Sequence, residues 1–152
     1  MKYNLKLITC IREPLDRLIS HYYYSNSHRK TMDFNSYYRL YMDKNEGWDQ
    51  ERIRTNNYMS KYLGFKNINE ITEENISKRY LFILILEFID LGYLKLSKIL
   101  NETDNISYKK LNCNKERKKD NLDDNLLTEF YERNKMDYEL YRLSKKIYYI
   151  YK

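Results

Sequence analysis

The spacing of apolar and polar residues predicts a short strand that runs directly into a helix near the start of the chain. Residues 6–11 are mostly apolar, and Arg12 and Pro14 follow them. Proline suits the first turn of a helix because its missing N–H has no helical partner there. Apolar residues then recur at helical spacing over about 14–25, which predicts a helix.

A second strand is predicted at 80–86, where the apolar run has no helical stripe and is typical of a buried parallel strand. Thr72 to Asn75 opens a short turn or helix, and 107–111 is a candidate edge strand. Further helices are expected over about 33–44 with Asp33 as N-cap, 52–63 ending at Gly64, 87–100, 122–134 and 136–151. This pattern predicts an α/β protein with a parallel sheet core and many helices. We expect one domain over 1–152, since no linker or internal repeat interrupts the chain.

The junction at Arg12 is the best candidate for chemistry. It stands at the carboxyl end of a predicted strand, where open α/β sheets bind their ligands. A guanidinium offers a fork of donors to an anionic oxygen, and Ser20 on the following helix can add a hydroxyl. The alternative is structural: Arg12 pairs with a carboxylate such as Asp16 or Glu87, and Ser20 bonds its own backbone. Arg17 is expected to pack or pair rather than to touch a ligand.

This junction, Ile-Arg-Glu-Pro-Leu-Asp-Arg-Leu-Ile-Ser-His-Tyr-Tyr-Tyr at 11–24, resembles the 3′-phosphate-binding motif of PAPS-dependent sulfotransferases. Glu13 stands where that family usually has Asp. The resemblance is greatest to the carbohydrate sulfotransferases, the group containing heparan sulfate 2-O-sulfotransferase and uronyl 2-O-sulfotransferase. Segments 57–64 and 80–90, and then 112–119 followed by 134–141, look like further family segments in the same order.

The resemblance implies a P-loop-NTPase-like sulfotransferase fold, here partial, that transfers a sulfuryl group from PAPS (3′-phosphoadenosine 5′-phosphosulfate) to a carbohydrate hydroxyl. The family positions that it assigns to the cofactor are Arg12, Ser20, Lys115 and Arg117, and those that it assigns to the acceptor are Asn57, Lys61 and Glu87. It assigns no catalytic base to this chain.

The family's opening Pro-Lys-x-Gly-x-Ser/Thr loop, which cradles the 5′-phosphosulfate, has no counterpart in the sequence. None of the three glycines, Gly47, Gly64 and Gly92, precedes a Lys-Ser/Thr pair. We therefore expect a carboxyl-terminal portion of a sulfotransferase, which retains 3′-phosphate recognition but does not transfer sulfate alone. Such a portion is expected to expose a sheet edge and apolar surface.

The net charge of +6 favours anionic partners: a nucleotide, an acidic sugar or nucleic acid. Much of the excess lies at 109–110 and 115–119, which is either a solvated loop or, by family position, a lid over the adenosine and 3′-phosphate. Two alternatives to the enzyme remain. One is a catalytically silent nucleotide- or anion-binding remnant. The other, less favoured, is a small basic nucleic-acid-binding protein that uses its 18 tyrosines to stack on bases.

The cysteines and histidines do not predict a metal site. Cys10 and Cys113 lack metal-ligand spacing with a histidine, so both are expected to be structural thiols, with Cys10 buried in the first strand. His21 follows Ser20 near a possible substrate hydroxyl, although a surface or capping role is favoured. The longest apolar run is too short to span a bilayer, and no signal-peptide stretch is found, whereas intact eukaryotic relatives of the family are typically Golgi membrane proteins.

Overall fold

The computed structural model describes residues 6–24, 31–43, 56–101 and 122–150. Strands β1 (Leu7–Ile11) and β2 (Tyr80–Ile85) pair in parallel. The two predicted strands are therefore confirmed, and so is their parallel arrangement. The candidate edge strand at 107–111, and the basic cluster with Lys115 and Arg117, lie outside the described residues.

The described part is mostly helical around this small parallel sheet, which is compatible with the predicted α/β class. The helices are α1 (Pro14–Tyr24), α3 (Phe34–Asp43), α5 (Tyr58–Tyr62), α6 (Glu73–Arg79), α7 (Ile89–Leu100), α8 (Asp124–Arg133) and α9 (Lys135–Ile150), with 3₁₀ turns η1 (Ile68–Glu70) and η2 (Leu86–Phe88). No helix among the described residues is long and apolar enough to cross a membrane.

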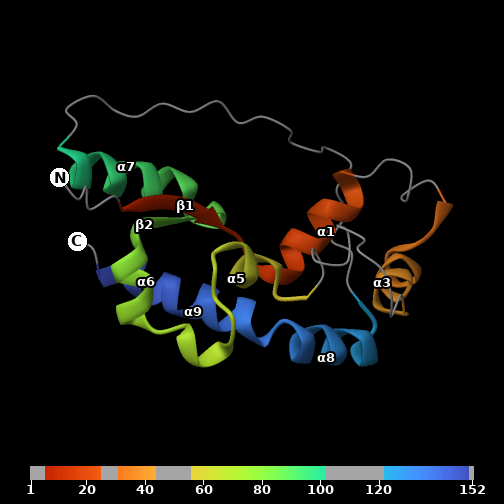
Figure 1. Cartoon of the computed structure of the whole chain (residues 1–152). Coiled ribbons are helices and arrows are strands. Elements are labelled where there is room, and N and C mark those ends of the chain that lie inside the picture. Colours follow the sequence, from red (N-terminus) through yellow and green to blue (C-terminus); the bar gives the residue numbers. More distant parts are fainter. Residues whose placement is uncertain (1–5, 25–30, 44–55, 102–121, 151–152) are drawn as a thin grey trace.

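Helices lie on both sides of the sheet (Figure 1). Helix α7 covers one side of the strands, and α6 and α9 lie on the other. Nearly all of β2 is buried, whereas Leu7 and Ile8 of β1 are 59% and 43% exposed. Within the described residues β1 is thus an edge strand with exposed apolar side chains, as the sequence led us to expect.

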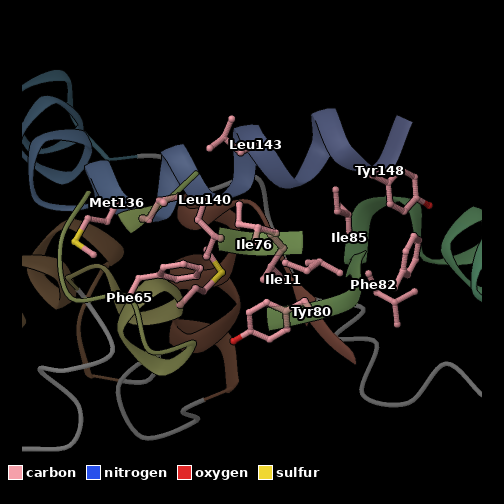
Figure 2. Packing of buried hydrophobic residues seen from close by; sticks show 14 of the residues in the cluster. Ile11, Phe65, Ile76, Tyr80, Phe82, Ile85, Met136, Leu140, Leu143 and Tyr148 are labelled. Carbon is pink, nitrogen blue, oxygen red and sulfur yellow. The ribbon is translucent and has the colours of Figure 1, made fainter. Parts of the chain in front are cut away.

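Two apolar clusters hold these elements together. The first packs β1 and β2 against α6 and α9, and Figure 2 shows side chains of both strands gathered under the α9 ribbon. The second joins α1, α3 and α8 and is rich in tyrosine: Tyr37 and Tyr38 are completely buried. Many tyrosines of this chain therefore serve the core rather than the surface.

Helix α5 begins later than expected. The sequence predicted a helix from about residue 52, but residues 56 and 57 form a bend and the helix starts at Tyr58. Asn57 adopts a left-handed conformation with φ 51°, which cannot continue a right-handed helix. The predicted end is confirmed, because Gly64 follows the helix with φ +80°, a conformation that favours glycine.

The cause of the late start is a reciprocal contact between α5 and α9. The carboxylate of the fully buried Asp137 accepts hydrogen bonds from the backbone N–H groups of Met59 (3.1 Å) and Ser60 (2.7 Å). In return, the side-chain oxygen of Asn57 accepts backbone N–H groups at the start of α9, at 2.9 and 3.3 Å. The side chain of Asn134 accepts the backbone N–H of Asn57 at 2.9 Å. Each helix thereby satisfies the free N–H groups of the other, which would otherwise be buried without partners.

We predict that Asp137→Asn lowers the free energy of unfolding by about 2 kcal/mol, because the amide keeps one acceptor oxygen and turns N–H donors toward a backbone N–H. Urea denaturation followed by circular dichroism measures the change. Asp124→Asn, at an exposed aspartate in the first turn of α8, is the matched control and should cost less than about 0.5 kcal/mol. Equal losses in both variants would contradict the role given to Asp137.

Candidate functional site

The parallel register brings two of the candidate site residues, Arg12 and Glu87, together at the carboxyl end of the sheet. Ile11 is paired with Ile85, so the residues after each strand leave the sheet side by side. The backbone N–H of Glu13 donates to Glu87 Oε1 at 3.0 Å. The turn after β1 is thereby joined to the turn after β2.

Arg12 contacts both of the carboxylates that were expected as its partners if its role is structural, Asp16 and Glu87. One guanidinium nitrogen donates to Asp16 Oδ2 at 3.2 Å, and Nε lies 3.8 Å from Glu87 Oε1. The side chain is 19% exposed, and Nε has no hydrogen-bond partner. Arg12 is thus an oriented cation with a donor still to be satisfied.

Glu13, where the sulfotransferase motif that this junction resembles usually has Asp, caps the start of α1. Glu13 precedes the first residue of α1, and its Oε2 accepts the backbone N–H of Asp16 at 2.6 Å. That is the bond by which an N-cap side chain satisfies a free helical donor. Asp16 and the half-buried Ser20 are one turn apart on one face of α1, and Arg12 precedes the helix and reaches Asp16 from its start.

Glu87 ties three elements together. Besides the N–H of Glu13, its carboxylate accepts the hydroxyl of Tyr141 from α9 at 3.2 Å. Loss of water around the phenol, and then the charge of Glu87, raise the pKa of the Tyr141 hydroxyl well above its usual range. Tyr141 therefore remains a proton donor to Glu87 at physiological pH. The expected contact of Glu87 with an acceptor stays a prediction.

The other two residues that the family resemblance assigned to the acceptor lie on or next to α5. The side chain of Asn57 is committed to the start of α9, whereas Lys61 is exposed on the helix. Neither is among the residues that line the cavity described next. Their contact with an acceptor also stays a prediction.

A cavity of about 310 Å³ lies between the carboxyl end of β1 and α5. The residues that line it include two arginines, Arg12 and Arg17, and two tyrosines, Tyr58 and Tyr62. The Arg17 guanidinium lies 4.8 Å from the centroid of the Tyr58 ring. The Tyr58 and Tyr62 rings are nearly parallel, with centroids 5.9 Å apart and an interplanar angle of 23°.

The sequence predicted no ligand contact for Arg17, Tyr58 or Tyr62. Arg17 does pack, as expected, but it also lines the cavity. The available signal was the four-residue spacing of Tyr58 and Tyr62, which places both rings on one side of a helix. Only the placement of α5 beside β1 turns that spacing into part of a site.

The expectation that Cys10 is buried was wrong. Cys10 is exposed, because the described residues leave this stretch of the edge strand β1 largely uncovered. The sulfur itself is partly shielded from water, and this shielding, together with the charge of Glu87, raises the pKa of the Cys10 thiol to about 11. The thiol is therefore accessible yet protonated at neutral pH.

His21 lies away from the cavity, in the aromatic cluster of α1 and α3. Its Nδ1 is 2.5 Å from the hydroxyl of Tyr37, which is fully buried. Within the described ranges, no group of three His, Cys, Asp or Glu side chains is arranged to hold a metal ion.

Comparison with known proteins identifies no relative. No family model matches the chain, and neither a curated protein nor a solved structure shows significant similarity to it.

The Arg12–Asp16 pair leads to a prediction about anion binding. Asp16→Asn should raise the affinity for inorganic pyrophosphate about fivefold, because an exposed ion pair contributes up to about 1 kcal/mol and an incoming anion must displace the carboxylate. Isothermal titration calorimetry measures the change, and Asp124→Asn adds the same charge in the first turn of α8 as a control. An unchanged affinity in Asp16→Asn would show that Asp16 does not compete.

The raised pKa of Cys10 predicts slow alkylation despite the exposure of the residue. In a Cys113→Ser variant, the reaction of Cys10 with iodoacetamide at pH 8 should be on the order of a hundredfold slower in the folded protein than in urea, because the thiolate is the reactive form. The folded-state rate should keep rising toward pH 11. Similar rates in the folded and unfolded chains would contradict the raised pKa.

Proposed function

We propose that this chain is a 3′-phosphate-binding portion of a PAPS-dependent carbohydrate sulfotransferase, with a P-loop-NTPase-like sulfotransferase fold. The observation that carries the proposal is the meeting of separate motif segments at one end of the sheet. Glu13 contacts Glu87, Tyr141 contacts Glu87, and the Arg17 guanidinium lies over Tyr58. The meeting of these segments is what the resemblance implies, and it supports the proposal.

The groups near Arg12 fit a phosphate. Glu13 and Glu87 each accept a backbone N–H, whereas the 39% exposed side chain of Asp16 pairs directly with Arg12 at 3.2 Å. In the proposed complex, Arg12 donates to the 3′-phosphate of PAPS and Ser20 adds its hydroxyl. Such charge-assisted bonds are the strong ones in phosphate recognition. Lys115 and Arg117, which the resemblance also assigns to the cofactor, lie outside the described residues.

The proposed acceptor is a carbohydrate, and Lys61 is an exposed cation on α5, the helix that forms one wall of the cavity. Asn57 and Glu87 contribute to this function by holding α5 and Arg12 in place. PAPS supplies the sulfuryl group when it is bound. The residues of this chain bind and orient the cofactor through its 3′-phosphate.

A second candidate, a nucleotide-binding remnant without transfer activity, is favoured by the glycines. Gly64 ends α5, and Gly92 lies within α7, where an added Cβ would come within 2.7 Å of Leu84 Cδ2. Both glycines of the described residues therefore have structural roles, and neither cradles a phosphate. The nucleic-acid-binding alternative gains less support, because several tyrosines that it would need for stacking are buried.

We predict that the chain binds 3′,5′-ADP more tightly than 5′-AMP, and that Arg12→Ala removes this preference. The loss should be roughly 1.5–3 kcal/mol, the contribution of a hydrogen bond to a charged group. Isothermal titration calorimetry with both nucleotides tests it. Arg142→Ala removes an exposed arginine that pairs with Glu139 on α9, and should leave the preference intact.

Equal affinities of the wild-type chain for 3′,5′-ADP and 5′-AMP would contradict a 3′-phosphate site at Arg12. Tight binding of single-stranded oligonucleotides that is insensitive to 3′,5′-ADP would favour the nucleic-acid alternative instead.

A further inference from the structure

The carboxylate of Glu87 is held just short of a hydrogen bond to Arg12. Its Oε1 lies 3.8 Å from Arg12 Nε, which is too long for a hydrogen bond, whereas the same oxygen accepts the backbone N–H of Glu13 at 3.0 Å. Its Oε2 accepts the hydroxyl of Tyr141 at 3.2 Å. Both oxygens are therefore engaged by donors other than the guanidinium.

This separation is unfavourable for Arg12 by itself. Its Nε atom is buried and has no hydrogen-bond partner among the described residues. A buried donor without a partner costs free energy, and a carboxylate is a strong acceptor for a guanidinium. Arg12 and Glu87 would gain from closing the gap, so another contact must keep the carboxylate where it is.

Tyr141 is the contact that can hold Glu87 back, because it comes from a different element. The N–H of Glu13 directly follows Arg12 in the chain and moves with it, so this bond cannot keep Glu87 away from Arg12. Tyr141 belongs to α9, which packs against β2. Its ring is half-buried, and the ammonium of Lys145 lies 5.3 Å from the ring centroid. The hydroxyl therefore donates to Glu87 from a position that does not depend on Arg12.

The position of Glu87 matters for an anion that binds at Arg12. A carboxylate bonded directly to a guanidinium offsets its charge and occupies its donors, so an incoming phosphate group has to displace that carboxylate. Asp16 already accepts one guanidinium N–H at 3.2 Å. If Glu87 also bonded Arg12, the anion would compete with two carboxylates in direct contact instead of one.

We propose that Tyr141 is a positioning residue for anion binding: its hydroxyl holds the Glu87 carboxylate away from Arg12, so that Arg12 keeps donors for a phosphate group. The inference rests on the proposed function only in taking Arg12 as the group that binds the anion. It adds that α9 contributes to the affinity through Glu87.

The test measures the affinity of the full chain for inorganic pyrophosphate by isothermal titration calorimetry. Tyr141→Phe keeps the ring and removes only the hydroxyl. It should weaken binding about fivefold, because Glu87 is then released to compete for Arg12. In a Glu87→Gln background the same change should have no effect, because a neutral amide does not compete with an anion. Tyr149→Phe removes an exposed hydroxyl from the same helix and, as the matched control, should leave the affinity unchanged.

A second measurement follows the contact itself. The proton–nitrogen NMR resonance of Arg12 Nε–H, assigned by its loss in Arg12→Lys, should move downfield in Tyr141→Phe, because Nε then donates to Glu87. The inference would be overturned if neither this resonance nor the affinity changed. It would also be overturned if Tyr141→Phe weakened binding equally in the wild-type and Glu87→Gln backgrounds, since a general loss of structure does not depend on the charge of Glu87.

The two proposals can fail separately. If pyrophosphate binding depends on Tyr141 but the chain does not prefer 3′,5′-ADP over 5′-AMP, the role of Tyr141 stands and the proposed function is overturned. If the chain prefers 3′,5′-ADP and Tyr141→Phe changes neither that preference nor the pyrophosphate affinity, only the role of Tyr141 is overturned. If the folded chain binds none of these anions, both proposals are overturned.

Discussion

The parallel pairing of β1 with β2 is the constraint on which the candidate site depends. Its register pairs Ile11 with Ile85, so each strand delivers its next residues to the same edge of the sheet. One strand supplies a cation in Arg12, and the other supplies the carboxylate of Glu87 that helps to orient it. An antiparallel pair would have placed these two residues at opposite ends. The helices on both sides of the strands keep this edge fixed, because they bury nearly all of β2.

A second long-range contact builds the wall that faces Arg12. A carboxylate without water is costly to bury unless hydrogen bonds compensate for its lost hydration. Asp137 is compensated by two backbone N–H groups of α5, and Asn57 returns the contact to α9. Helix α9 also packs against the sheet. It therefore sets the position of α5 relative to β1. The cavity between β1 and α5 thus depends on two networks, the pairing of β1 with β2 and the hydrogen bonds between α5 and α9.

The elements were predictable from the sequence wherever local patterns decide them. The strand–Arg–Pro–helix junction, the buried run at Tyr80–Ile85 and the helix end at Gly64 all follow from periodicity and turn chemistry. The late start of α5 and the exposure of Cys10 were not predicted. The first depends on the contact of Asn57 with α9, nearly eighty residues away, and the second on how much of β1 the rest of the chain covers. The cavity was missed for the same reason, because its walls come from segments that only the fold brings together.

The two carboxylates beside Arg12, those of Glu87 and Asp16, differ in how firmly they are held. Glu87 is held by the N–H of Glu13 and by the hydroxyl of Tyr141, so its carboxylate cannot move without breaking contacts to two other elements. Asp16 is 39% exposed and reaches Arg12 from one helical turn away, as a surface pair that contributes little stability. Water can replace Arg12 as the partner of Asp16. Replacing Arg12 at Glu87 would disturb the two turns that follow β1 and β2. In the proposed complex, the anion meets a guanidinium that Glu87 already orients, and it competes with Asp16, the more exposed of the two carboxylates.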